Sequence, residues 1–144
     1  MAHAKRDQEH LGIDTNVLVA YLDREHPSHR RTEKLAQRAV ALNPTIVHEA
    51  YHTLVFKMKW KEREASQTLT EAMADDRNLF INQTLKTTKA GLRIASEHGL
   101  GGRDALILAS FITAGIDEMV SFDDELTALK KLTYGKSTLT ITSL

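Results

Sequence analysis

Short apolar runs alternate along the chain with longer segments in which apolar residues recur at helical spacing. The short runs predict strands at residues 10–13, 45–47, 78–81, 119–122 and 137–141. The periodic segments predict helices at about residues 17–22, 28–40, 49–59, 62–73, 84–97, 104–114 and 126–132. Strands that alternate with helices are typical of α/β domains. We therefore expect a three-layer α/β/α sandwich around a parallel five-stranded sheet.

The segment after Asp104 is apolar on most of its helical faces, with Ala105, Leu106, Ile107 and Leu108 in succession. A helix of this kind is buried on most sides, because no face is suited to water. We expect it to lie inside the domain, with its first residues at the edge of the core.

The length of 144 residues fits one domain, which we expect over residues 10–144 after a flexible tail over residues 1–9. No apolar run is long enough to span a bilayer, and the first residues lack the apolar core of a signal peptide. The absence of cysteine excludes disulfides and thiolate metal sites. These features together favour a cytoplasmic protein.

Positive and negative charges balance, with 19 Lys and Arg residues against 19 Asp and Glu residues. Proteins that grip long duplexes by neutralising phosphates are usually basic. Any nucleic acid must therefore be bound through a local patch of positive charge or through bound cations.

Acidic residues stand at the predicted strand ends and at the start of the buried helix. Asp14 follows the first predicted strand, Glu49 follows the strand at 45–47, and Asp104 begins the buried helix. Asp123 and Asp124 follow the strand at 119–122. Ligands of open parallel sheets bind at the carboxyl ends of the strands, so these side chains are candidates for one common site.

Several carboxylates that converge would repel one another and take up protons unless a cation lay between them. Mg²⁺ and Mn²⁺ prefer oxygen ligands and commonly bind phosphate as well. Taken singly, each of these acids could also be a helix cap that interacts with the helix dipole. Their joint placement favours a metal site.

Four motifs resemble those of PIN domains, in particular VapC-type toxins. They are Ile13-Asp14-Thr15-Asn16, Ile46-Val47-His48-Glu49, Arg103-Asp104-Ala105-Leu106 and Ser121-Phe122-Asp123. Together they span nearly the whole chain in the family's order, and four in sequence are more specific than any one alone.

The resemblance implies a ribonuclease that depends on Mg²⁺ or Mn²⁺, hydrolyses single-stranded RNA and leaves a 5′-phosphate. It assigns metal binding and catalysis to Asp14, Glu49, Asp104 and Asp123. It also implies that Asn16 and Ser121 orient these carboxylates by hydrogen bonds. A small VapB-like antitoxin and a homodimer are further expectations from the family, although PIN domains also process RNA without an antitoxin.

Basic residues near the acids are candidates for contacts with RNA phosphates. Arg103 adjoins Asp104, and a basic run comprises Lys57, Lys59, Lys61 and Arg63. For that run, a solvated helix end is an equal alternative. Asp124 is ambiguous, since the family's acid matches Asp123.

The helix predicted at 49–59 and the residue Trp60 carry more apolar side chains than one buried face requires. We expect Trp60, with Leu54 or Phe56, to line a groove for an amphipathic partner segment. Packing against the next helix or a second subunit is the alternative.

His48-Glu49-Ala50-Tyr51-His52 also satisfies the zinc metalloprotease motif H-E-x-x-H. The predicted strand before His48 places this histidine at a strand–helix junction, which argues against two ligands on one helix. Val55 and Met58 stand where an extended metzincin motif needs glycine and histidine, and Glu71 is the candidate third ligand that remains.

Two other classes use a similar fold. Phosphatases of the haloacid dehalogenase type have an aspartate where this chain has Asn16, and receiver domains need an acid pair and a lysine that are not found here. A silent binding module is disfavoured, because no carboxylate position of the PIN pattern is missing.

Overall fold

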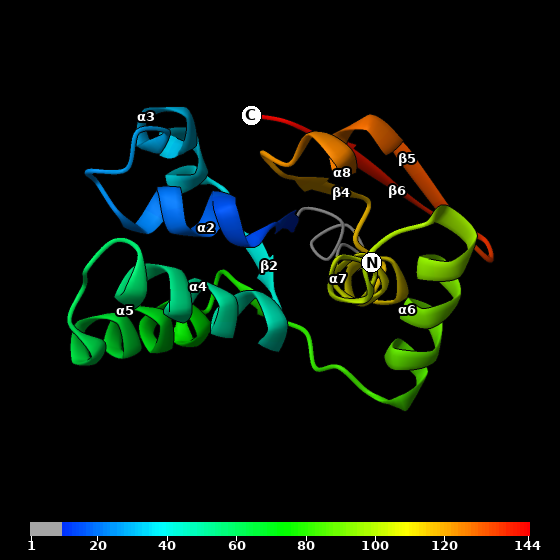
Figure 1. Cartoon of the computed structure of the whole chain (residues 1–144), viewed down its shortest axis with the longest axis horizontal. Coiled ribbons are helices and arrows are strands. Elements are labelled where there is room, and N and C mark those ends of the chain that lie inside the picture. Colours follow the sequence, from blue (N-terminus) through cyan, green and yellow to red (C-terminus); the bar gives the residue numbers. More distant parts are fainter. Residues whose placement is uncertain (1–9) are drawn as a thin grey trace.

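A twisted sheet of six strands forms the centre of the computed structural model, which describes residues 10–144 (Figure 1). The predicted flexible tail at residues 1–9 lies outside the described residues. The strands are β1 (Leu11–Ile13), β2 (Val40–Leu42), β3 (Leu79–Phe80), β4 (Glu118–Val120), β5 (Lys131–Tyr134) and β6 (Ser137–Thr142). Their order across the sheet is β3-β2-β1-β4-β6-β5, and every neighbouring pair is parallel except β5 and β6. The predicted α/β class is therefore confirmed, and the sheet that was expected to be parallel is parallel except at β5.

The helices flank this sheet. They are α2 (Thr15–Leu22), α3 (His29–Thr32), the 3₁₀ helix η1 (Glu33–Gln37), α4 (Pro44–Phe56), α5 (Glu62–Ala74), α6 (Leu85–His98), α7 (Gly102–Thr113) and α8 (Asp124–Leu129). Figure 1 shows α2 to α5 gathered at one end of the molecule, and α6, α7 and the β5–β6 hairpin at the other. Within residues 10–144, no helix combines the length and apolar character needed to cross a membrane.

The sheet has six strands and not the expected five, and the additional strand lies in the last part of the chain. The helix predicted at 126–132 ends at Leu129, and Lys130 then adopts a positive φ of 64°. Leu132 instead lies on β5, opposite Leu139 of β6, and both side chains are buried. Gly135, with φ of 60°, makes the turn between the two strands. Two buried leucines on one sheet face therefore outweighed the helical spacing.

The second structural unit also differs from the prediction. Residues 45–47 are not a strand but lie in the first turns of α4, and the strand at this place is β2. The helix predicted at 28–40 is correspondingly shorter, consisting of α3 and η1. Asn43 caps α4 by accepting a hydrogen bond from Ile46 N at 3.0 Å, and Pro44 occupies the first turn. Capping by Asn43 and burial of Ile46 and Val47 override the strand preference of β-branched residues.

The apolar helix α7 packs inside the domain, as its sequence predicts. Ile107, Leu108 and Phe111 are each at most 1% exposed. The Phe111 ring lies so near the backbone of β1 that a Cβ atom at Gly12 would stand 3.0 Å from it. This close packing fixes α7 against β1, the two elements that carry Asp104 and Asp14.

Candidate active site

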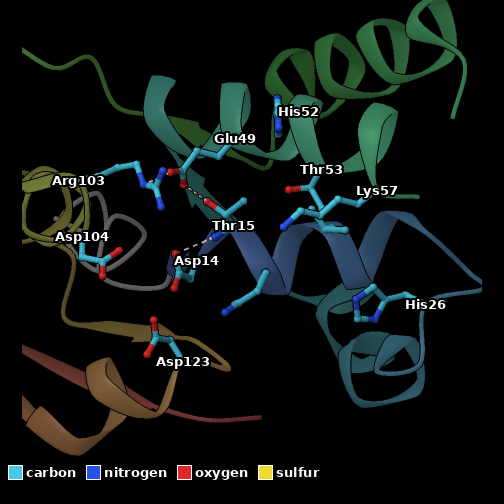
Figure 2. A pocket seen from close by; sticks show the side chains of 12 residues that line it. Asp14, Thr15, His26, Glu49, His52, Thr53, Lys57, Arg103, Asp104 and Asp123 are labelled. Carbon is cyan, nitrogen blue, oxygen red and sulfur yellow. Dashed lines mark hydrogen bonds and ion pairs between the residues drawn. The ribbon is translucent and has the colours of Figure 1, made fainter. Parts of the chain in front are cut away.

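Four carboxylates from four different elements line one pocket of about 570 Å³. Asp14 follows β1, Glu49 lies in α4, Asp104 is in the first turn of α7, and Asp123 precedes α8. Figure 2 shows Asp14, Asp104 and Asp123 turned toward a common space, with Glu49 beside Arg103. The structure thus brings the four predicted acids together, although Glu49 arrives on a helix and not at the predicted strand end.

Asp14 is the most buried of these acids, at 6% exposure. Both of its oxygens accept hydrogen bonds, Oδ1 from Thr15 N at 2.8 Å and Oδ2 from the Ser121 hydroxyl at 2.7 Å. Burial raises the pKa of Asp14, these two hydrogen bonds oppose the rise, and the charges of Asp104 and Glu49 add to it. Ionisation of Asp14 therefore costs free energy in the folded protein.

Asn16 and Ser121 fix the loop that carries Asp123. Ser121 Oγ, besides donating to Asp14, accepts a hydrogen bond from Asp123 N at 3.0 Å. Asn16 Oδ1 accepts from Phe122 N at 3.2 Å and makes no hydrogen bond to a carboxylate among the described residues. Asp123 in turn caps α8 by accepting from Glu125 N at 2.8 Å. Ser121 therefore contacts a carboxylate directly, whereas Asn16 acts on the backbone of the neighbouring loop.

Glu49 is held by Thr15, a residue that the sequence interpretation did not single out. The Thr15 hydroxyl donates to Glu49 Oε1 at 2.7 Å, and Arg103 Nε forms an ion pair with Glu49 Oε2. The signal available in the sequence was only the position of Thr15 beside Asp14. Arg103, predicted to contact phosphate, is paired with a carboxylate here while most of its side chain remains exposed.

Asp104 is half-buried and occupies the first turn of α7, where the helix dipole favours a negative charge. Its pKa is nevertheless raised, by burial first and then by the charge of Asp123, with Arg103 opposing and Glu49 and Glu125 adding to the rise. Burial, together with repulsion from the other carboxylates, thus outweighs stabilisation of the Asp104 charge at this helix end.

The chemistry of these donors fits a hard divalent cation. All four side chains offer carboxylate oxygens, the ligands that Mg²⁺ and Mn²⁺ prefer, and the raised pKa of Asp14 shows that added positive charge would be favourable. As they stand, no three His, Asp or Glu side chains within residues 10–144 form a ready-made metal cage. Arg103 pairs with Glu49 Oε2, so this oxygen can reach a cation only when that ion pair opens.

The competing zinc motif does not assemble in space. His48 lies within α4, so the strand–helix junction expected there is wrong. His48 lines a pocket with Tyr51, Leu69 and Met73, whereas Glu49 and His52 line the acidic pocket. Glu71, the candidate third ligand, lines a different pocket again. The three proposed zinc ligands therefore face three separate pockets.

Some of the other residues predicted to make contacts line the acidic pocket, and others do not. Of the basic run, only Lys57 lines the acidic pocket, together with His26 and His52, which the sequence interpretation did not assign to the site. Asp124 is exposed and does not line it. Leu54 is fully buried, so its expected place in a partner groove is wrong, because α4 uses it to contact the core.

A family model for the PIN domain matches residues 12–132, which is most of the chain. The chain belongs to the PIN domain family. No curated protein sequence matches it. The PIN family model covers all four acids, which confirms the resemblance seen in the motifs.

Solved structures with similar folds agree with this assignment. One is VapC20 of Mycobacterium tuberculosis, a sarcin-ricin loop cleaving toxin. It has a TM-score of 0.71 at 14% identity, over 88% of this chain and 97% of that one. VapBC2 from Rickettsia felis, bound to a DNA fragment from its promoter, has a TM-score of 0.63 at 17% identity, over 93% and 98%. PAE2754 from Pyrobaculum aerophilum has a TM-score of 0.58 at 20% identity, over 92% and 83%. The chain therefore shares its three-dimensional fold with these solved structures.

Replacement of Asp104 by asparagine is predicted to stabilise the metal-free protein near neutral pH. Below the pKa of an unfolded aspartate the residue is protonated in both states, so the two proteins should unfold alike. As pH rises through the raised pKa of folded Asp104, ionisation destabilises the wild-type protein alone. The difference in free energy of unfolding, measured by urea denaturation from acid to neutral pH, should therefore grow in favour of the variant.

Manganese provides the matched control for this experiment. It should raise the melting temperature of the wild-type protein, since a ligand of the folded state stabilises it, and should do so much less in Asp104→Asn. A variant that is less stable at neutral pH, with the manganese effect intact, would identify Asp104 as a structural residue at the helix dipole.

Proposed function

We propose that this PIN domain is a divalent-metal-dependent endoribonuclease that hydrolyses phosphodiester bonds of single-stranded RNA. The observation that carries the proposal is the single pocket lined by Asp14, Glu49, Asp104 and Asp123. We further propose that residues 10–144 act as one domain and that the enzyme works in the cytoplasm. Mg²⁺ or Mn²⁺ is the proposed cofactor, to be held by the four carboxylates.

When bound, such a cation lowers the pKa of water and neutralises charge on a phosphodiester. The chain's own contribution is to hold oxygen donors in place. Ser121 and Thr15 keep Asp14 oriented, and Thr15 also orients Glu49 across the pocket. Asn16 fixes the loop on which Asp123 is carried. Arg103, exposed at the rim, is placed to exchange its contact with Glu49 for one with a phosphate oxygen.

The toxin role is supported by proteins of similar structure. VapC20 is a sarcin-ricin loop cleaving toxin, and similar chains occur in a toxin–antitoxin complex from Klebsiella pneumoniae and in VapBC2. We propose that this chain is the toxin of such a pair, bound by a small VapB-like antitoxin, and that it forms a homodimer.

Cleavage of single-stranded RNA by the purified protein is the first test. Activity should require Mg²⁺ or Mn²⁺ and stop with EDTA. Asp14→Asn and Asp104→Asn should each lose about 100-fold or more in rate, because an amide binds a divalent cation far less well than a carboxylate. Both should remain folded; at Asp14 the Ser121 hydroxyl can accept a hydrogen bond from the amide in place of donating one.

Asp124→Asn is the matched control, since this neighbouring acid is exposed outside the pocket. It should keep near wild-type activity. Rates close to wild type in Asp14→Asn or Asp104→Asn, or equal losses in all three variants, would contradict the assignment of the site.

Expression in a growing bacterium tests the toxin role separately. The wild-type chain should arrest growth, Asp14→Asn should not, and co-expression of a small protein encoded beside it should restore growth and co-purify with the chain. Cleavage in vitro without growth arrest or an inhibitory partner would contradict the toxin role and favour RNA processing without an antitoxin.

A further inference from the structure

The acidic pocket has a second end, away from the carboxylates. His26, from the turn after α2, and Lys57, the residue that ends α4, line this part. Figure 2 shows both on the side of the pocket opposite Asp104 and Asp123. From this arrangement we propose that His26 and Lys57 form a binding subsite for a backbone phosphate of the RNA strand, away from the bond that is cleaved. The inference rests on the proposed function for its ligand.

Lys57 has the charge that such a subsite needs. Arg103, the other strong base of the pocket, is paired with Glu49, while within residues 10–144 the Lys57 ammonium forms no ion pair or hydrogen bond. By contrast, Lys59 donates to the Phe56 carbonyl at 3.2 Å. In a chain of zero net charge, an unpaired ammonium that lines the pocket supplies local attraction for a phosphodiester.

His26 is preorganised to donate from its outer nitrogen. The backbone N–H of Ser28 donates to His26 Nδ1 at 3.0 Å, so in the neutral ring the proton resides on Nε2. The turn is fixed further by His26 N donating to Asp23 O at 3.0 Å and by His29 N donating to His26 O at 2.9 Å. These hydrogen bonds thus hold a ring whose Nε2 can donate in the lining of the pocket that Lys57 shares.

The chemistry of the pocket favours a single strand as its occupant. Carboxylates at one end suit a cation and the scissile phosphate. The two basic side chains at the other end suit a second phosphate of the same strand. His52 also lines the pocket, with its ring centroid 4.8 Å from that of Phe56, which is 59% exposed. Exposed aromatic faces beside a cationic group are characteristic of sites where unpaired bases stack.

Binding of a short fluorescent single-stranded RNA in EDTA tests the subsite without cleavage. Lys57→Gln should weaken binding about three- to tenfold and reduce the slope of log Kd against log salt by about 0.7, as expected for one lost phosphate contact. Lys57→Arg should restore both. Lys61→Gln removes the same charge from a nearby exposed position outside the pocket and should leave both unchanged.

His26→Asn is the second variant. Its shorter side chain can still accept the Ser28 N–H in an Asx turn, but it no longer presents a donor to the pocket. At a pH where the imidazole is neutral, binding should weaken with little change in the salt slope, because the substitution then removes a hydrogen-bond donor and no formal charge. In cleavage assays with Mn²⁺, both variants should raise KM and keep kcat within about twofold, as expected when contacts are equal in the ground and transition states.

The outcomes separate this inference from the proposed function. If Lys57→Gln binds RNA with the affinity and salt slope of Lys61→Gln while melting normally, the subsite is rejected, whether or not the protein cleaves RNA. Absence of RNA binding by the wild-type protein would reject it as well. If binding depends on Lys57 as predicted but no cleavage occurs with any divalent metal, the subsite stands and the nuclease function fails.

Discussion

The burial of one carboxylate, that of Asp14, is the constraint on which the rest of the site depends. Asp14 follows β1, which has parallel neighbours on both sides in the middle of the sheet, and only 6% of it is exposed. A buried carboxylate needs hydrogen bonds or a nearby positive charge. Thr15 and Ser121 supply the hydrogen bonds, but Asp104 and Glu49 add negative charge. A divalent cation is the partner whose chemistry matches this set of oxygens.

The two residues that follow Asp14 link it to the other acids. Thr15 reaches Glu49 on α4, and Asn16 holds the backbone of the loop before Asp123. The ring of Phe111 against β1 fixes α7, and with it Asp104, at the same edge of the sheet. Three consecutive residues after β1 therefore connect elements that lie more than thirty positions away along the chain. A displacement of β1 would disturb all four carboxylates together.

The sequence could predict those parts of the site that are attached to strong local patterns. Asp14 and Asp104 adjoin apolar runs that had to be buried, so their positions followed from hydrophobic spacing. Glu49 was proposed because it follows the predicted strand at 45–47 and matches a family motif. That strand was wrong, because Asn43 capping and core packing formed a helix instead. The antiparallel strand β5 was missed because its short segment continues the helical spacing of α8.

The other end of the pocket could not be assembled from local sequence, although Lys57 had been named in the basic run. His26 follows α2 and Lys57 follows α4, and they line the same pocket because α2 packs against α4, a contact with no signature in either segment. Thr15 was visible beside Asp14, but its partner Glu49 stands 34 positions away. Features that depend on the packing of distant helices thus required the three-dimensional structure.

The central claim is that these four carboxylates together bind the metal on which RNA cleavage depends. The most direct measurement is anomalous X-ray scattering from crystals soaked in Mn²⁺ at a concentration that supports cleavage. We predict a strong anomalous peak among the carboxylate oxygens of Asp14, Asp104 and Asp123, in contact with at least two of them, which disappears in Asp14→Asn. Manganese bound elsewhere, or no peak in this pocket at that concentration, would contradict the account.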